Sequence, residues 1–244
     1  MNKSKLLVGF ALLCFVLYFV FQLSESYYWS DVFRALIIPL ITLLYFINVK
    51  NKSVYFSGFL ILYSVSELLT LVSPYLSIDI DYFLGNTLYI SAYILLIYEI
   101  LKSMNFGYVI RNYSIHLVVL TALSAYIVSV LLKITSPYTS GKEFVVEFIY
   151  NLITLILLSV ALINFLYRDS KKSLLMFFGA LCIVFSEMIQ IAYFYIYTNL
   201  LMTEILNLSY TALLIASFCF FYSQSKLKRS KSEKSSILVN SESY

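Results

Sequence analysis

Long apolar runs alternate with short polar connections along almost the whole chain. Eight such runs stand out, at about residues 5–23, 32–49, 54–75, 82–101, 112–133, 144–167, 173–197 and 202–223. Each is close to the ~20 residues that a helix needs to cross the hydrocarbon core of a bilayer. A segment that spans a bilayer must satisfy its own backbone hydrogen bonds, so each run is predicted to be a helix. The sequence therefore predicts an all-α, polytopic transmembrane bundle of eight helices over residues 1–223.

The composition excludes a soluble protein. Hydrophobic residues make up 61% of the chain and charged residues only 12%, with a mean hydropathy of +0.86. Soluble domains carry about 25% charged residues. The net charge of +4 comes from basic residues spread over short loops and one tail, which is the pattern of membrane topology. We therefore expect an integral membrane protein with no nucleic-acid partner.

The basic residues also predict an orientation. Fourteen of the seventeen fall on one side of the predicted bundle, and only Arg34, Lys133 and Lys142 fall on the other. Loops rich in Lys and Arg are usually cytoplasmic, so both termini are predicted to be cytoplasmic, in the plasma membrane if the organism is bacterial. An odd number of spans would destroy this alternation. The first run exceeds a signal-peptide core and lacks a small-residue cleavage site, so we expect it to be retained. Residues 224–244, rich in Ser and Lys, are predicted to form a disordered tail.

Two of the runs contain a carboxylate well inside their length. Glu67 and Glu187 each follow a serine in an apolar environment. A charged side chain at the bilayer centre costs about 2.5–3.5 kcal/mol on insertion scales, so such residues usually face the bundle interior and mark a functional site. Lys52 precedes Glu67 by the interval that separates Lys172 from Glu187, which places both acids roughly 22 Å from the basic side. This repeat, four spans apart, suggests two four-helix halves in parallel orientation.

Polar residues at helical spacing accompany the two acids. Tyr63 shares a stripe with Glu67, and Gln190 shares one with Glu187. Arg34 enters the second span from the outer side. Further stripes lie on the fourth span (Asn86, Tyr89, Tyr93), the sixth (Glu143, Glu147, Tyr150, Thr154) and the eighth (Asn207, Tyr210, Thr211). These stripes predict a polar cavity that opens toward the outer leaflet. The residues predicted to bind substrate there are Arg34, Tyr63, Asn86, Tyr89, Gln190, Asn207 and Tyr210.

The chemistry of such a cavity leaves two classes of function open. Two carboxylic acids in a low-dielectric cavity do not both ionise easily, because desolvation and mutual repulsion oppose the second charge. A protonated acid beside an ionised one is the arrangement that acid–base hydrolysis needs. The same residues also suit a non-catalytic binding protein for lipids or small molecules, or a proton-coupled transporter. Buried glutamates also form hydrogen bonds that only fix helix packing.

The remaining reactive residues point to no cofactor. Cys14, Cys182 and Cys219 all lie inside apolar runs, where a cysteine acts as a small buried hydrophobe. His116 is the only histidine, and it lies near the basic side of the fifth span. We therefore predict no metal site, no disulfide and no cofactor.

Several of these motifs resemble the lysoplasmalogenase (YhhN-like) family of eight-span membrane proteins. The likeness extends over residues 32–220 and is carried by short stretches. It includes residues 58–71 around Glu67, the Tyr-Phe-Leu-Gly sequence at 82–85, and Gly179-Ala-Leu-Cys-Ile-Val-Phe-Ser-Glu187. Arg34 and Pro39 partly match a basic residue and a proline in the second span of the family.

The resemblance implies hydrolysis of the vinyl ether bond of a lysoplasmalogen, a single-tailed membrane lipid, to a fatty aldehyde and a glycerophospho head group. The two family aspartates that are implied to be catalytic are Glu67 and Glu187 here, and the family's fourth-span histidine falls at Ser91, which joins the predicted substrate-binding set. One glutamic acid would protonate the vinyl ether carbon. The other, ionised, would stabilise the resulting cation and activate water. The head group and the oligomeric state stay open.

Overall fold

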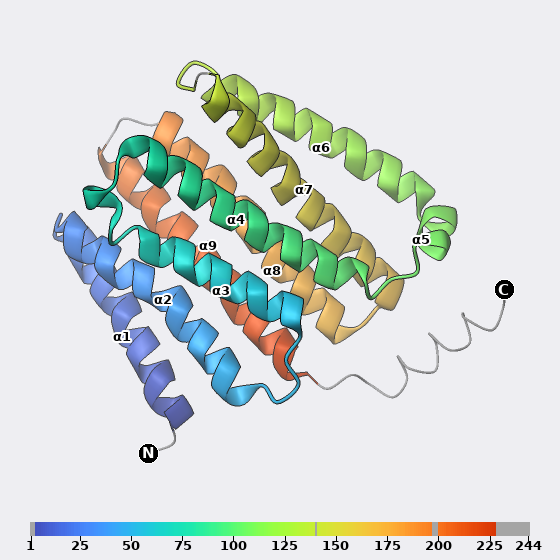
Figure 1. The fold of residues 1–244 in the computed structure, drawn as a ribbon, viewed down its shortest axis with the longest axis horizontal. Coiled ribbons are helices and arrows are strands. Elements are labelled where there is room, and N and C mark those ends of the chain that lie inside the picture. Colours follow the sequence, from blue (N-terminus) through green and yellow to red (C-terminus); the bar gives the residue numbers. More distant parts are fainter. Residues whose placement is uncertain (1–2, 140, 197–199, 228–244) are drawn as a thin grey trace.

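The computed structural model describes residues 3–139, 141–196 and 200–227, and all of their regular secondary structure is helical (Figure 1). The all-α prediction is therefore confirmed. The helices are α1 (Lys3–Leu23), α2 (Tyr27–Asn48), α3 (Val54–Leu69), the 3₁₀ turn η1 (Ser73–Tyr75), α4 (Ile78–Leu101), α5 (Phe106–Asn112), α6 (Ser114–Thr135), α7 (Lys142–Arg168), α8 (Lys171–Tyr195) and α9 (Leu200–Lys226).

Seven of the described helices are long and apolar enough to cross a membrane, namely α1, α2, α4, α6, α7, α8 and α9. The sixteen residues of α3 give a shorter helix of about 24 Å. It nevertheless packs between α2 and α4 (Figure 1). Eight helices thus run side by side through the bundle, and each corresponds to one of the predicted spans.

The boundaries depart from the predicted ones at three places. α3 ends at Leu69 instead of residue 75, since Pro74 in the following turn has no N–H to continue a helix. The short helix α5 was not predicted; its N-cap Asn105 accepts a hydrogen bond from the Tyr108 N–H at 3.3 Å. α9 continues through Lys226 because Gln224 is buried in the bundle. The rest of the predicted tail, residues 228–244, lies outside the described residues.

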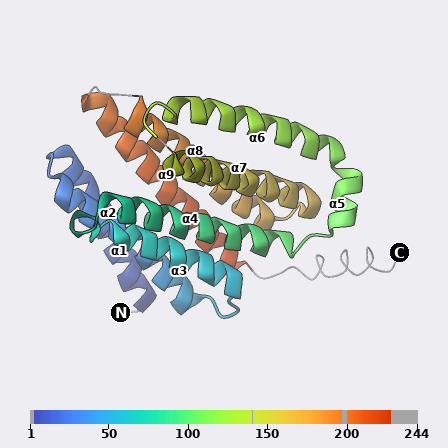
Figure 2. The same cartoon turned by 45° about the horizontal axis from the view of Figure 1, so that its top comes forward.

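The helices pack in the same order in both halves of the chain. In the first half α1 packs on α2, α2 on α3 and α3 on α4; in the second half α6 packs on α7, α7 on α8 and α8 on α9. The halves meet through contacts of α4 with α7 and of α9 with α2. If α1–α4 correspond to α6–α9, each of these contacts joins the fourth helix of one half to the second helix of the other. Figures 1 and 2 place α1 and α6 on the outside of the bundle. This order agrees with two parallel four-helix halves.

The core lies where α2, α3, α4, α8 and α9 meet. Its largest fully buried side chains include Phe59, Tyr63, Tyr93 and Phe218. Phe59 and Phe218 stack with ring centroids 5.6 Å apart. Close packing of aromatic rings thus holds the two halves together.

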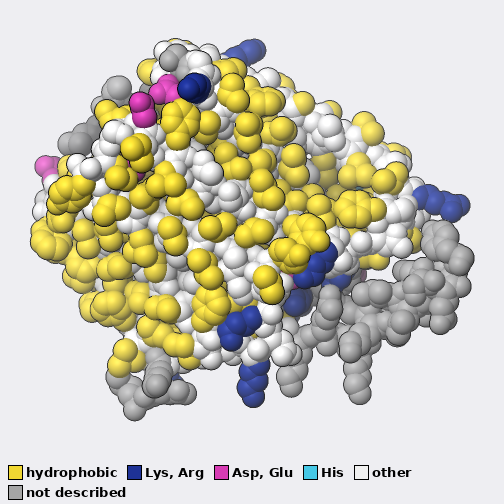
Figure 3. All heavy atoms as spheres, in the orientation of Figure 1, with side chains coloured by type: hydrophobic (Ala, Val, Ile, Leu, Met, Phe, Trp, Pro, Cys, Tyr) yellow, Lys and Arg dark blue, Asp and Glu magenta, His cyan; other side chains and the backbone are white. Residues whose placement is uncertain are grey.

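The polar loops divide between the two ends of the bundle. α1 begins and α9 ends at the same end, which also holds the loops α2–α3, α4–α5 and α7–α8 (Figure 1). We call this the basic end because Lys50, Lys52, Lys102, Arg168 and Lys172 lie there. Figure 3 shows hydrophobic side chains over most of the visible flank, with Lys and Arg mainly at its lower and right-hand margins. The apolar flank supports a multi-pass membrane protein. That the basic end is cytoplasmic stays a prediction.

Candidate functional site

The two Ser-Glu dipeptides occupy equivalent places in the two halves. Ser66 on α3 donates a hydrogen bond to the Gly85 carbonyl on α4 at 3.3 Å, and Ser186 on α8 donates one to the Tyr210 carbonyl on α9 at 2.8 Å. In each half the serine therefore ties its helix to the next one in the chain. The glutamate that follows it is held at a fixed rotation of that helix.

Glu67 is held by a cation and a hydroxyl. Its side chain is buried, at 1% exposure. Arg34 on α2 donates from Nη1 to Glu67 Oε2 at 3.3 Å, and the Tyr89 hydroxyl on α4 donates to Oε1 at 3.1 Å. An arginine side chain stays charged in proteins, so it stabilises the ionised form of this carboxylate. Both carboxylate oxygens thus have a partner, and the outer side of Arg34 faces Asp31 at 3.7 Å.

Glu187 has a hydroxyl partner but no cation. The Tyr93 hydroxyl on α4 donates to Glu187 Oε1 at 2.7 Å, and the side chain is half-buried. Over the three described stretches of the chain, no Lys, Arg or His nitrogen lies within 4.0 Å of this carboxyl group. The described partners of this carboxyl group are neutral hydroxyls, so a negative charge on Glu187 is compensated less than one on Glu67.

One face of α4 links the two acids. Tyr89 and Tyr93 are four residues apart, so their side chains lie on the same face, about 5–6 Å apart at Cβ. The Tyr63 ring packs against both, with centroids 4.8 Å from Tyr89 and 6.1 Å from Tyr93. The Tyr150 ring on α7 also contacts both, at 6.5 and 5.9 Å. Four tyrosine rings therefore pack together beside the two carboxyl groups, and we call this cluster the tyrosine wall.

The structure brings together only part of the predicted substrate-binding set. Arg34, Tyr63 and Tyr89 lie around Glu67, as described above. The Asn86 amide donates to the Tyr82 carbonyl of its own helix at 2.8 Å. Asn207 is buried and accepts from the Tyr18 hydroxyl on α1.

The other members of the set are less closely tied to the acids. Tyr210 is buried, and its carbonyl accepts the bond from Ser186. Ser91 and Gln190 are half-buried on α4 and α8. A role of these three residues in substrate binding stays a prediction.

Two contact residues lay on the predicted polar stripes but outside the predicted substrate-binding set. Tyr93 and Tyr150 are both hydroxyl partners of Glu187. Their signal in the sequence was helical spacing: Tyr93 follows Tyr89 by four positions. In a chain with 23 tyrosines, that spacing alone did not distinguish these two from the rest.

A large pocket lies at the basic end, away from the two acids. It has a volume of about 880 Å³, and its lining includes Lys172 and Val54, the first residue of α3, which lies about 20 Å along that helix from Glu67. The cavity predicted around the glutamates stays a prediction. Within the described residues, no group of three His, Cys, Asp or Glu side chains is placed to hold a metal ion.

Comparisons with known proteins give no relative from which a role for Glu67 and Glu187 could be taken. No protein-family model matches the chain, and no curated protein or solved structure matches it either. The kinship suggested by the sequence motifs is therefore a proposal, and the contacts of Glu67 and Glu187 carry the functional argument.

Proposed function

We propose that this protein is an integral membrane hydrolase that cleaves the vinyl ether bond of a single-tailed lysolipid. The observation that carries the proposal is the unequal environment of the two acids. Glu67 has Arg34 at 3.3 Å, whereas the described partners of Glu187 are neutral tyrosine hydroxyls, those of Tyr93 at 2.7 Å and of Tyr150. One ionised and one protonated carboxyl group joined by a wall of tyrosines is the pairing that acid–base hydrolysis uses.

The proposed reaction begins at Glu187. Its carboxyl proton passes to the vinyl carbon remote from the ether oxygen, and the π electrons form the new C–H bond. The adjacent carbon becomes an oxocarbenium centre, which the negative charge of Glu67 stabilises. A water molecule then attacks this carbon and gives a proton to Glu67, which leaves a hemiacetal.

Breakdown of the hemiacetal restores both acids. Its hydroxyl proton passes to the Glu187 carboxylate, the carbon–oxygen bond to the glycerol breaks, and the departing oxygen takes the proton from Glu67. The products are a fatty aldehyde and a glycerol hydroxyl, and the net reactant besides the lipid is one water molecule. In this scheme Arg34 is a positioning residue that returns Glu67 to its ionised form.

One observation favours a different class, a lipid-binding protein or a proton-coupled transporter. Glu67 is 1% exposed and both of its oxygens already have partners, so a substrate would have to displace part of this arrangement. In a proton-coupled transporter, Glu67 would stay ionised beside Arg34, and Glu187 alone would gain and lose a proton. The chain has only six glycines and three prolines, however, which offers little of the helix interruption typical of transporters.

The experiment that separates the classes uses purified protein in detergent, where no gradient exists. An alkenyl lysophosphatidylethanolamine is supplied, and release of the fatty aldehyde is measured. The matched control lipid is the saturated alkyl ether, which lacks the double bond that must be protonated. A hydrolase releases aldehyde from the first lipid alone. If no aldehyde forms, while the protein in sealed vesicles moves protons when a lysolipid is added, the transporter is the correct class.

A further inference from the structure

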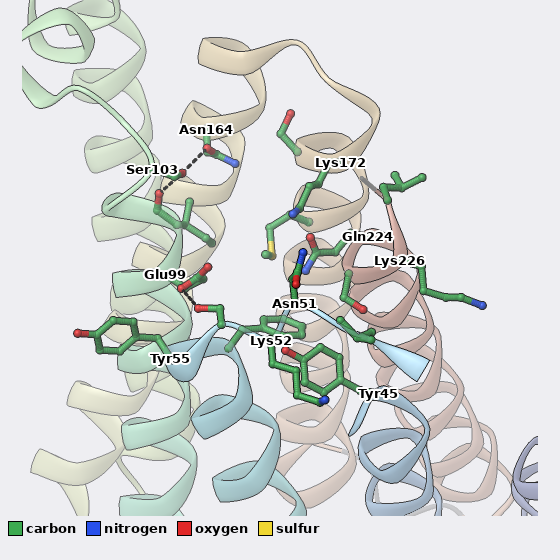
Figure 4. Close-up of a pocket in the computed structure, with 18 of the residues that line it drawn as sticks. Tyr45, Asn51, Lys52, Tyr55, Glu99, Ser103, Asn164, Lys172, Gln224 and Lys226 are labelled. Carbon is green, nitrogen blue, oxygen red and sulfur yellow. Dashed lines mark hydrogen bonds between the residues drawn. The ribbon is translucent and has the colours of Figure 1, made fainter. Parts of the chain in front are cut away.

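The pocket at the basic end is built from the ends of six helices. α2, α4, α7 and α9 end there, while α3 and α8 begin there. The pocket has a volume of about 880 Å³, which is within the usual range for small-molecule sites. Figure 4 shows Asn51, Lys172 and Gln224 in its middle, while Lys226 points outward.

Positive charge dominates the lining. Among the described residues that line it, Glu99 is the one acidic residue, and the basic residues are Lys50, Lys52, Lys102, Arg168, Lys172 and Lys226. Glu99 is already engaged, because Lys102 donates to it at 3.0 Å and Ser53 also donates to it. Within the described parts of the chain, Lys50 and Lys52 form no ion pair. A concave surface with an excess of one charge concentrates the field and attracts ligands of the opposite charge.

A buried polar group in the same pocket lacks a partner. Gln224 is 4% exposed, and among the described residues its Oε1 has no hydrogen-bond partner. Buried polar atoms are nearly always paired in folded proteins. An amide can accept a bond from a ligand hydroxyl and donate to a ligand oxygen. Gln224 therefore indicates a ligand that carries oxygen and hydroxyl groups.

Two helix N-termini add to the attraction for anions. Ser53 and Ser170, the N-cap residues of α3 and α8, both line the pocket. The Ser170 side chain caps α8, whereas the Ser53 side chain makes no cap bond to α3 and bonds to Glu99 instead. The first N–H groups of α3 are thus not satisfied by their cap side chain, and such groups favour anionic ligands.

We propose that this pocket binds a phosphate ester, either the head group of an anionic phospholipid or a soluble polyol phosphate. The phosphate would contact the lysines of the α2–α3 loop and Lys172, and its hydroxyl-bearing part would reach Gln224. The site is separate from the two acids. Glu67 lies about 20 Å along α3 from Val54, the first residue of that helix, which lines the pocket. In one lysolipid, by contrast, a single glycerol unit separates the phosphate from the ether oxygen. One lysolipid cannot occupy both places, so this proposal does not rest on the hydrolase.

The test measures binding of three probes to the full chain in a zwitterionic detergent: short-chain phosphatidic acid, glycerol 3-phosphate and inorganic phosphate. Binding is expected to be saturable and to weaken as salt rises. Each basic residue near an anionic lipid contributes about 1 kcal/mol, or about fivefold in affinity. The variant with Lys50→Gln and Lys52→Gln should therefore bind about 25-fold more weakly. Preference for phosphatidic acid identifies the lipid head group, and equal binding of glycerol 3-phosphate identifies the soluble ester.

Matched variants decide whether the pocket is responsible. The variant with Lys133→Gln and Lys142→Gln removes the same charge at the opposite end, and Lys171→Gln removes an exposed neighbour that does not line the pocket; both should bind like the original chain. Gln224→Leu changes no charge and should still weaken binding. Absence of saturable binding, or equal losses in the two double variants, overturns the proposal. Release of aldehyde from lysoplasmalogen is measured on the same variants and should not change with the loss of binding.

Discussion

Glu67 and Glu187 stand in the same Ser-Glu dipeptide and have different partners. Each follows a serine that bonds to the next helix, and each accepts a hydrogen bond from a tyrosine of α4. In the part of the chain that the structure describes, only Glu67 of the two has a cation within 4.0 Å. The spacing that relates Glu67 to Glu187 relates Arg34 to Thr154, a buried neutral residue whose hydroxyl bonds to the Tyr150 carbonyl of its own helix at 2.9 Å.

This comparison shows how a repeated structure can acquire unequal acids. The two halves share helix order and the serine bonds, so the scaffold sets where both carboxyl groups lie. The residue at the equivalent position of α2 and α7, Arg34 or Thr154, differs in charge, and only Arg34 contacts an acid among the described residues. An arginine stabilises the anion, whereas a neutral side chain leaves the acid to the apolar environment. If the proposed function is correct, this single difference assigns the proton donor.

The largest expected effect comes from removing the cation. Arg34→Met leaves the buried Glu67 without its charge partner, and breaking a buried ion pair on one side costs about 3–5 kcal/mol. The equivalent change in the second half, Thr154→Val, should cost far less because no charge is stranded. Thermal unfolding in detergent compares the two. Adding Glu67→Gln to Arg34→Met should recover most of the loss, and equal effects of Arg34→Met and Thr154→Val would contradict the unequal charge states.

A second effect concerns turnover more than stability. Glu187→Gln keeps the size of the side chain and removes its proton, and loss of a general acid lowers rates by about 10²–10⁴-fold. Aldehyde release should fall by that factor while the unfolding temperature stays close to that of the original chain. Tyr150→Phe keeps the ring beside this acid and removes one of its hydroxyl partners, so it should lower turnover far less than Glu187→Gln. Parallel loss of stability and activity in Glu187→Gln would instead assign this residue to helix packing.

The two tyrosines of α4 allow a finer comparison. A hydrogen bond to a charged group contributes about 1.5–3 kcal/mol and one between neutral groups about 0.5–1.5. Tyr89→Phe removes the bond to the ionised Glu67, and Tyr93→Phe removes the bond to Glu187. Tyr89→Phe should therefore be the more destabilising of the two in the same unfolding assay. The reverse order would place the ionised acid at Glu187 and exchange the roles in the proposed reaction.

The sequence predicted the scaffold better than the site. Apolar runs located the eight long helices of the described chain, because a helix that crosses a bilayer must be apolar along its length, but they did not show the short helix α5. Helical spacing placed Tyr63 beside Glu67 correctly, since both lie on one helix. The hydrogen bond from Tyr93 to Glu187 joins α4 to α8. The sequence of a single helix does not determine how that helix is rotated relative to another, so this bond could not be predicted. The basic pocket is still less accessible from sequence, because six helix ends must meet before Lys52, Lys172 and Gln224 share one cavity.

The smallest expected effect tests the feature that the two halves share. Ser66→Ala and Ser186→Ala each remove one bond from a serine hydroxyl to a carbonyl of the next helix, at 3.3 and 2.8 Å. Hydrogen bonds between transmembrane helices contribute about 0.6 kcal/mol on average. Each variant should lower the unfolding free energy by about that amount, with Ser186→Ala the larger because its bond is shorter. The effects should add in the double variant, because the serines lie in different halves and share no partner. Strong non-additivity would mean that the two helix pairs are coupled through the tyrosine wall, so that a change at one acid reaches the other.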